Sequence, residues 1–339
     1  GTLDGSRGVY KVAGNLNVTT IAGTLSVAGS GNGEIFARDE AVIRAGSCIL
    51  GETSGGLGEV RLTSGASLLV EAIPVEVPAP GGDKGEVAFG FLIVGRQSNG
   101  LIELFDAGTR LTCENATLGG DNVASGGTIS VDTGTTLAAS SSLTMGNNVG
   151  PALLRVANGG TVDVGAFLQV GPNGLLLASV NGQVNCSTLD LNGRAEIVLN
   201  LTIERPATEK NTDYVASKGA LEPFVINGDL EMGADGVLQV AAMEGTALQV
   251  TGSATLAGTL EIALEPGVTY TNNERLDLIA FAGGTTGAFE SVTFLNAPEG
   301  FEGAAELVEG VLQLRVVQGG TGTEGEGEGE GEGEGEGEG

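Results

Sequence analysis

Residues 143–165 read LTMGNNVGPALLRVANGGTVDVG, and this stretch decides the fold because glycines separate its short runs of branched apolar residues. A helix is excluded, since each of the five glycines would cost a helix about 1 kcal/mol relative to alanine. Runs such as Val162-Asp163-Val164 alternate apolar and polar residues, which is typical of a strand with one buried face. The stretch therefore predicts short β-strands joined by tight glycine turns.

The composition extends this prediction to most of the chain. Its 339 residues include 60 Gly, 41% hydrophobic and 4% aromatic residues, and neither His nor Trp. Gly exceeds twice its usual share of about 7%, yet no Gly-X-Y period occurs, which excludes collagen. Val, Leu and Ile alternate with polar residues over most of the length, which excludes general disorder. The composition is that of a long β-rich chain with many turns.

A four-residue signature close to Leu-x-aliphatic-Gly recurs along the chain. Its glycines are Gly51, Gly95, Gly119, Gly146, Gly171 and Gly193. From Gly95 onward the gaps are 24, 27, 25 and 22 residues, and the longer gap before it contains an insertion. Such a period indicates stacked units, each unable to bury its own apolar face, so we expect coils of about 24 residues.

A second signature, apolar-x-x-Gly-x-x-apolar, lies inside each period. It occurs at Leu62/Gly65/Leu68, Val131/Gly134/Leu137 and Val156/Gly159/Val162, one residue longer at Leu104/Gly108/Leu111, and with Asp for Gly at Phe36/Asp39/Val42. Gly and Asp both tolerate the left-handed backbone region, so this position is predicted to turn a corner. The flanking apolar residues are predicted to be the last inward residue of one strand and the first of the next.

Each coil is thus expected to hold roughly three strands of 3–5 residues, and coils to stack about 4.8 Å apart in long parallel sheets. The motifs LTMG, LLRVANGGTVDVGAFLQVG and GTISVDTGTTL resemble the right-handed parallel β-helix of autotransporter passenger domains and related bacterial surface β-strand-repeat proteins. The resemblance covers about residues 12–260 and implies an all-β solenoid. It does not specify function, because this repeat style serves adhesins, stalks and enzymes.

The chain is predicted to have three parts. Residues 1–258 are expected to form the coils, with excursions at 71–90 and 204–214. Residues 259–318 hold longer alternating strands and are expected to form a C-terminal β cap, with further coils as the alternative. Residues 319–339 end in eight Glu-Gly pairs, which have no apolar face and repel one another. This last part is therefore predicted to be a disordered, flexible tether.

The net charge and the hydropathy pattern limit the possible partners of the protein and its cellular location. The net charge is −28, and residues 1–323 alone carry −20, which argues against nucleic acid and anionic lipid as partners. No run reaches the roughly 20 apolar residues of a membrane-spanning helix, and residues 1–14 lack the apolar core of a signal peptide. We expect an extracellular or cell-surface protein whose leader is not in this chain. No cofactor is expected, and diffuse Ca²⁺ binding stays open.

Several kinds of catalytic site are excluded by composition. Without His, neither a Ser-His-Asp or Cys-His arrangement nor His-ligated zinc is possible. Acidic residues on predicted strands are Glu103, Asp132, Asp163, Asp190 and Glu196. Asp163 and Asp190 lie about one period apart and could stack, but no convergent pair with a basic partner is expected, and lone acids are expected to be solvated. No catalytic or metal-ligating residue is predicted.

The two excursions are the candidate interaction loops, because loops carry binding on solenoids. The residues singled out in them are Pro74, Pro78, Asp83, Lys84, Arg205, Glu209, Lys210, Asp213 and Tyr214. The alternative is that both excursions are passive flaps over the side of the solenoid.

Three cysteines test the coil alignment. Their odd number leaves at least one thiol unpaired. The alignment puts Cys113, Ala139, Val164 and Cys186 in one inward column, with Cys113 and Cys186 three coils apart, about 14 Å. A disulfide requires Cα atoms within about 7 Å. Because Cys48 lies farther still along the axis, we predict three free, buried thiols.

The function predicted from these observations is structural or adhesive. The chain would be a non-catalytic extracellular or cell-surface β-helix, tethered through its Glu-Gly segment to a larger structure. Its partner would be a cell-surface or matrix component, or a second copy stacked end to end. A self-assembling filament or surface-layer subunit is one alternative, and a polysaccharide lyase or hydrolase is another. Clustered acidic and basic side chains on one sheet face would favour the enzyme.

Overall fold

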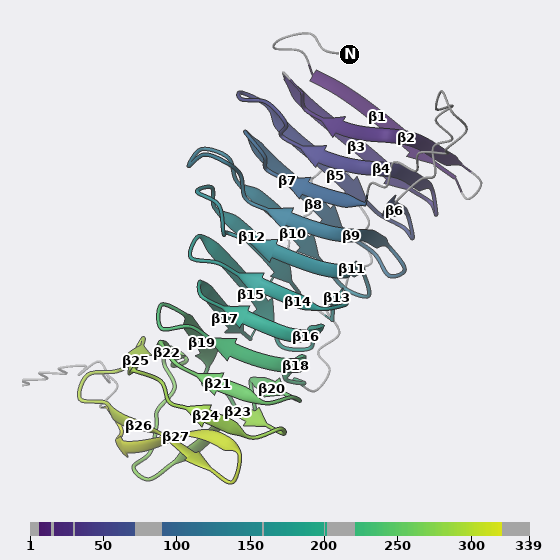
Figure 1. Ribbon diagram of the computed structural model, residues 1–339. Helices are drawn as coiled ribbons and strands as arrows, with labels where there is room; N and C mark the ends of the chain where they lie inside the picture. The colour runs from purple at the N-terminus through teal and green to yellow at the C-terminus, as the bar shows by residue number, and fades with distance from the viewer. Residues whose placement is uncertain are drawn as a thin grey trace, which may run out of the picture.

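The strands wind into a solenoid in which successive segments alternate between two long sheets (Figure 1). The computed structural model describes residues 7–14, 17–29, 31–71, 90–157, 159–199, 201 and 221–320. Every regular element in these residues is a β-strand, and they hold no helix long and apolar enough to cross a membrane. The predicted all-β solenoid of parallel coils is confirmed.

The first sheet, sheet A, contributes one strand to each coil, and all of its pairings are parallel. Its strands, in spatial order, are β1 (Arg7–Ala13), β3 (Asn32–Arg38), β5 (Leu57–Leu62), β8 (Asn99–Leu104), β10 (Gly127–Val131), β12 (Ala152–Val156), β15 (Gly174–Ser179), β17 (Arg194–Val198), β19 (Val237–Ala241), β22 (Thr259–Ala263) and β25 (Ser291–Leu295).

The second sheet, sheet B, holds the remaining strands. They are β2 (Val18–Val27), β4 (Val42–Leu50), β6 (Ser67–Val70), β7 (Phe91–Val94), β9 (Arg110–Leu118), β11 (Thr136–Met145), β13 (Thr161–Val164), β14 (Phe167–Val170), β16 (Gln183–Leu191), β18 (Phe224–Met232), β20 (Leu248–Val250), β21 (Ala254–Leu256), β23 (Arg275–Phe281), β24 (Thr285–Gly287), β26 (Glu302–Val308) and β27 (Val311–Gln318).

A line of bends divides sheet B into a first half and a second half. The register shifts within β11 between Ala139 and Ser142, and within β16 between Asn185 and Thr188. In other coils the chain leaves the sheet at the same place, so that β6 and β7, or β13 and β14, are separate strands. The expected three short strands per coil therefore occur where the sheet is interrupted, and elsewhere one long strand crosses the bend.

The corner residues and the inward columns are as predicted. Gly134 and Gly159 have φ of 64° and 83°, which only glycine adopts readily. Leu104, Val131 and Val156 pair in register in sheet A, and all three are fully buried. The matching residues of sheet B are also paired and fully buried, and they are Leu111, Leu137 and Val162. The core is thus built from columns of side chains, one residue from each coil.

One coil departs from the predicted alignment by one residue. Ala37 and Ile43 face the core there, whereas Phe36 and Val42 point outward and are only partly buried. The corner position that Gly65 occupies in the next coil is taken by Glu40, with φ of 62°. Asp39 has the predicted left-handed backbone, with φ of 57°, but the inward residues Phe36 and Val42 were assigned one position too early. The register was missed because a left-handed Glu is rare, so the sequence does not mark Glu40 as the corner residue.

Antiparallel strands follow the last coil of sheet B. β23 pairs in parallel with β20 on one edge and antiparallel with β27 on the other, and β27 pairs antiparallel with β26. Three aromatic rings meet edge to face near these strands. The ring centre of Phe301 lies 5.4 Å from that of Phe294 and 5.8 Å from that of Tyr270. β22 and β25 continue sheet A in parallel, so residues 259–318 contain both arrangements. The predicted flexible tether lies, from residue 321 on, outside the described residues.

The three thiols are free and buried, as predicted. Cys113 pairs in register with Ala139, and Ala139 with Val164, while the neighbouring pair Val162 and Val184 places Cys186 next in the same column. Burial raises the pKa of Cys48 and of Cys113 to about 12 and that of Cys186 to about 11. They act as small apolar side chains of the core.

A charge inside a column should disrupt the fold, whereas a charge outside should not. We expect Val156→Asp to lower the free energy of unfolding by several kcal/mol, because an unpaired carboxylate cannot be solvated there. Leu153→Asp, on the outward face of the same strand, should cost less than about 1 kcal/mol. Urea unfolding followed by circular dichroism measures both. Equal losses would mean that the inward and outward faces are assigned wrongly.

The thiols should make the fold sensitive to alkali. Their folded-state pKa values lie above the ordinary 9.0, so the unfolded chain releases these protons first as the pH rises. Stability should therefore fall above about pH 9. A variant with Cys48, Cys113 and Cys186 all changed to Ala should lose less stability between about pH 8 and about pH 10 than the unmodified protein does. Parallel urea titrations compare the two proteins, and identical losses of stability would contradict the raised pKa of the buried thiols.

The free state of the thiols has its own test. Alkylation in denaturant without reductant should label all three cysteines.

Candidate binding groove on the outer face

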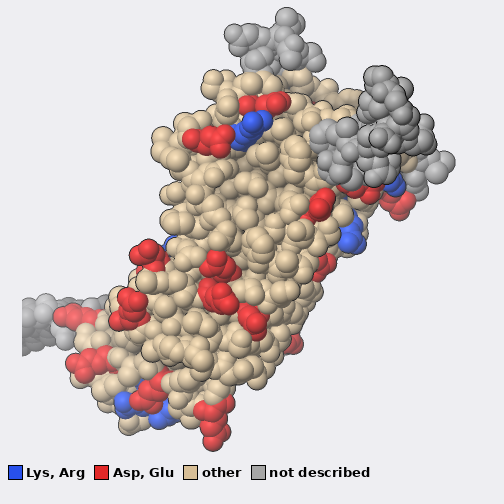
Figure 2. Space-filling view, viewed as in Figure 1, with Lys and Arg blue, Asp and Glu red and all other residues tan. Residues whose placement is uncertain are grey.

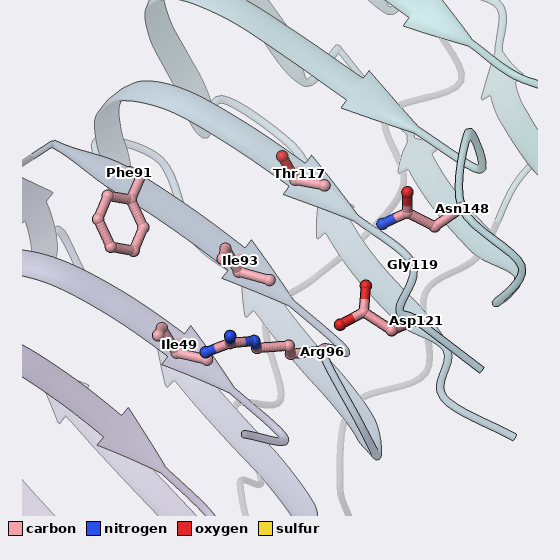
Figure 3. Close-up of a pocket in the computed structure, with 8 residues that line it drawn as sticks. All are labelled: Ile49, Phe91, Ile93, Arg96, Thr117, Gly119, Asp121 and Asn148. Atoms are coloured by element: carbon pink, nitrogen blue, oxygen red, sulfur yellow. The ribbon is translucent and has the colours of Figure 1, made fainter. Parts of the chain in front are cut away.

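A groove lies on the outer face of sheet B, along its second half (Figure 3). Its volume is about 320 Å³, and its lining comes from four successive coils. The lining residues are Ile49, Phe91, Ile93, Arg96, Thr117, Gly119, Asp121 and Asn148. Ile49, Ile93 and Thr117 pair in register across neighbouring strands, so they form one outward column that is the floor of the groove.

The turns that follow the second half of sheet B form one wall. Asp121 N–H donates to Arg96 O at 2.9 Å, and Gly150 N–H donates to Gly120 O at 2.9 Å, so turns of successive coils are bonded to each other. Gly120 has no space for a side chain, because a Cβ there would lie 2.0 Å from Ser125 Oγ. The wall is therefore held by backbone bonds and close contacts, and the groove is preformed.

The groove combines apolar surface with both signs of charge. Figure 3 shows Phe91 on one side of the two floor isoleucines and Asp121 and Asn148 on the other. Phe91 exposes 38% of its surface. Arg96 lies 4.0 Å from a carboxylate oxygen of Glu52. The eight lining residues thus combine an apolar floor with one cation, one anion and one amide, a mixture that is common in small binding sites.

A second, polar groove of about 530 Å³ follows the line of bends. Asn227 Nδ2 donates to Asn185 Oδ1 at 2.6 Å, and Asn185 Nδ2 donates to Asp163 Oδ1 at 2.5 Å. Three coils thus contribute to one ladder of side-chain hydrogen bonds, and Arg110 lies at the end of the same groove. Each of the two amide groups donates one hydrogen bond to the preceding coil, which stiffens this face.

Asp163 and Asp190 do not stack, although their separation by about one period left that arrangement open. Asp163 lies in the first half of sheet B and bonds to Asn185, whereas Asp190 lies in the second half. Asp190 accepts hydrogen bonds from Gln169 Nε2 at 2.8 Å and from Asn192 Nδ2 at 2.5 Å. The period alone suggested proximity, but the bend between the two strand halves separates the residues onto different columns.

The expectation of solvated acids without basic partners is also wrong. On the outer face of sheet A, Arg61 forms ion pairs with Glu34 and Glu59 and bonds Glu103 at 2.8 Å. Glu103 exposes only 7% of its surface. The pairing was invisible in sequence because the excursion between β6 and β7 puts Arg61 and Glu103 42 residues apart. Asp132, at 4% exposure, is likewise buried.

A similar cluster lies farther along sheet A. Arg194 forms ion pairs with Glu196 and Glu261, and it donates to Gln239 Oε1 at 2.6 Å. These bonds raise the pKa of Arg194. Both clusters gather acidic and basic side chains on one face of sheet A, which is the feature expected to favour an enzyme. In each cluster, however, every carboxylate is an ion-pair partner of the arginine, which is also the arrangement of a structural ladder between coils. Figure 2 shows the acidic side chains dispersed over the visible face with broad uncharged areas between them.

The predicted interaction loops lie outside the described residues, and so do all nine residues singled out in them. Their attachment points are described. The first excursion leaves sheet B after Glu71 and returns at Gly90, on the line of bends. The second leaves after β17 and returns before β18, at the corner between the sheets. The first excursion therefore joins the coil next to Phe91 of the groove.

Sequence reasoning missed the groove itself. Its floor consists of outward apolar residues, Ile49 and Ile93, in the phase that was assigned to solvent. Its wall comes from turns after the Leu-x-aliphatic-Gly signature, and the gap of 27 residues after Gly119 was a sign that one turn projects. No protein-family model matches the chain, and no curated protein matches it either.

The Arg61 cluster should stabilise the coils. Arg61→Met leaves Glu103 buried without its cation, so we expect a loss of about 2 kcal/mol in the free energy of unfolding. Arg44→Met is the matched control, because the Arg44–Glu71 pair is about half exposed and should contribute under about 1 kcal/mol. Adding Glu103→Gln to Arg61→Met should restore part of the stability in urea titrations. Equal losses for the two arginine variants would refute the structural role.

Proposed function

We propose that this protein is a non-catalytic extracellular or cell-surface β-helix with an adhesive role, and that the groove of Figure 3 holds its ligand. The observation that carries the proposal is the groove itself. It is preformed by stacked turns, has an apolar floor, and is bordered by one cation, one anion and an amide. Such a mixture suits recognition of a partner through apolar contact and a few oriented hydrogen bonds.

Three further features support this function. The rigid coil spaces its outer residues at a fixed interval, which makes an extended scaffold for presenting a binding surface. The acidic composition suits a soluble, exposed protein and disfavours polyanionic partners. The resemblance of the repeats to bacterial surface β-strand-repeat proteins points to the same location. The partner of such an adhesive protein would be a component of a cell surface or of an extracellular matrix.

A variant pair tests the groove. Ile93→Glu puts a charge on the floor, and Leu69→Glu puts the same charge on an outward, half-buried position of the same coil in the first half of sheet B. Labelled protein is applied to glycan arrays and to plates coated with matrix proteins or mucin. We expect Ile93→Glu to weaken binding at least roughly tenfold, because the floor would have to desolvate a carboxylate, whereas Leu69→Glu should bind normally.

The thermal midpoint of each variant shows whether the fold is intact. Equal binding by both variants and the unmodified protein would refute the groove as the ligand site. Any polysaccharide that the protein binds is also incubated with it and assayed for new reducing or unsaturated ends. Release of such ends would refute the non-catalytic assignment and would favour a polysaccharide lyase or hydrolase.

A further inference from the structure

Two exposed phenylalanines share one outward column in the second half of sheet B. Phe91 pairs in register with Asn115, Asn115 with Ser142, and Ser142 with Phe167. Phe91 exposes 38% and Phe167 42%, and these are the two phenylalanines exposed beyond a third among the described residues. Three strand spacings separate them, which amounts to about 14 Å along the solenoid axis.

The surface between the two rings is polar and uncharged. Ser142 Oγ donates to Asn115 Oδ1 at 2.8 Å, and the Asn115 amide group itself carries two donor protons. In the adjacent column, the hydroxyls of Thr117 and Thr144 are 3.4 Å apart and share one hydrogen bond. The strip therefore offers a row of hydroxyl and amide groups between two aromatic faces. Phe91 and Thr117 also line the groove of Figure 3, so the strip continues it.

Acidic residues border this strip. Glu114 is exposed at the bend beside Asn115, and Asp121 lies on the groove wall beyond Thr117. These carboxylates, together with the net charge of −28, disfavour an anionic ligand. The backbone of the strip is not available either, because β9 and β11 each pair with a strand on both edges. An extended peptide therefore cannot add to the sheet as a further strand.

We infer that the strip from Phe91 to Phe167 binds an uncharged, linear polysaccharide lying along the solenoid axis. The electron-rich faces of the two phenyl rings attract the polarised C–H groups on the apolar face of a sugar ring. The hydroxyl and amide row bonds the sugar hydroxyls between them. A single sugar cannot touch both rings across about 14 Å, so the ligand is a chain. This inference rests on the proposed binding function and names its ligand class.

Removal of each phenyl ring tests whether the ligand reaches from Phe91 to Phe167. Phe91→Ala and Phe167→Ala each remove one ring, and Phe36→Ala is the matched control, because Phe36 is an outward ring on sheet A. The probes are soluble neutral polysaccharides, namely β-glucan, galactomannan and arabinoxylan, used in affinity electrophoresis. Polygalacturonate serves as the anionic probe and a polyproline peptide as the protein probe. Thermal midpoints report folding of every variant.

We expect the unmodified protein to be retarded by at least one neutral polysaccharide and not by polygalacturonate. Each of the two strip variants should bind roughly fivefold more weakly, and the control variant should bind normally. Disaccharides of the retained polymer should bind at least roughly tenfold more weakly than fragments long enough to reach both rings. These results together would establish an axial site that spans four coils.

Other outcomes would overturn the inference in distinguishable ways. Loss with Phe91→Ala alone would confine the ligand to the groove and refute the axial span. Retention by polyproline or polygalacturonate without any neutral polysaccharide would refute the ligand class. If no neutral polysaccharide is bound while Ile93→Glu still abolishes binding to coated surfaces, the ligand class fails and the proposed adhesion stands. If the unmodified protein binds no coated surface and no polymer, both proposals fail.

Discussion

The parallel backbone ladder is the constraint on which the rest of this structure depends. A strand residue inside the stack, such as Val131, is paired with one residue of the coil before and one of the coil after, at a spacing of about 4.8 Å. Side chains are therefore ordered in columns. Inside, a column such as Leu104, Val131 and Val156 excludes water completely. A residue in such a column must be apolar whatever its neighbours in sequence are, which explains the periodic pattern of the chain.

The same ladder orders the outer faces, where nothing requires apolar residues. Polar side chains there form columns of their own, and each finds its partner on the next coil. Asn227, Asn185 and Asp163 form one such column, and Arg61 and Glu103 form part of another. These interactions keep coils in register from outside as packing does from inside. Clusters of opposite charge on a solenoid face are thus compatible with a purely structural role.

The candidate groove and the strip beside it arise from departures from the regular coil. The bend in sheet B separates the polar groove from the second half of the sheet, and longer turns after that half make the wall of the candidate groove. Between these features, Phe91, Asn115, Ser142 and Phe167 occupy one uninterrupted column. The regular coils therefore carry irregular turns and bends, and the fixed interval between coils sets the distances between the outward side chains of the strip. This is how a repetitive sequence can present a surface of defined length.

The sequence by itself determined the β-solenoid, the coil length, the corners at Gly134 and Gly159, the inward columns and the free state of the thiols. All of these follow from the alternation of apolar residues and from the rarity of residues that tolerate a left-handed turn. The tertiary structure alone decided which outward residues meet. It separated Asp163 from Asp190, joined Arg61 to Glu103, placed Glu40 at a corner and aligned Phe91 with Phe167. Which outward residues become neighbours depends on coil lengths, bulges and insertions that differ from coil to coil. Because these positions face solvent, the sequence there shows no apolar pattern from which their partners could be predicted.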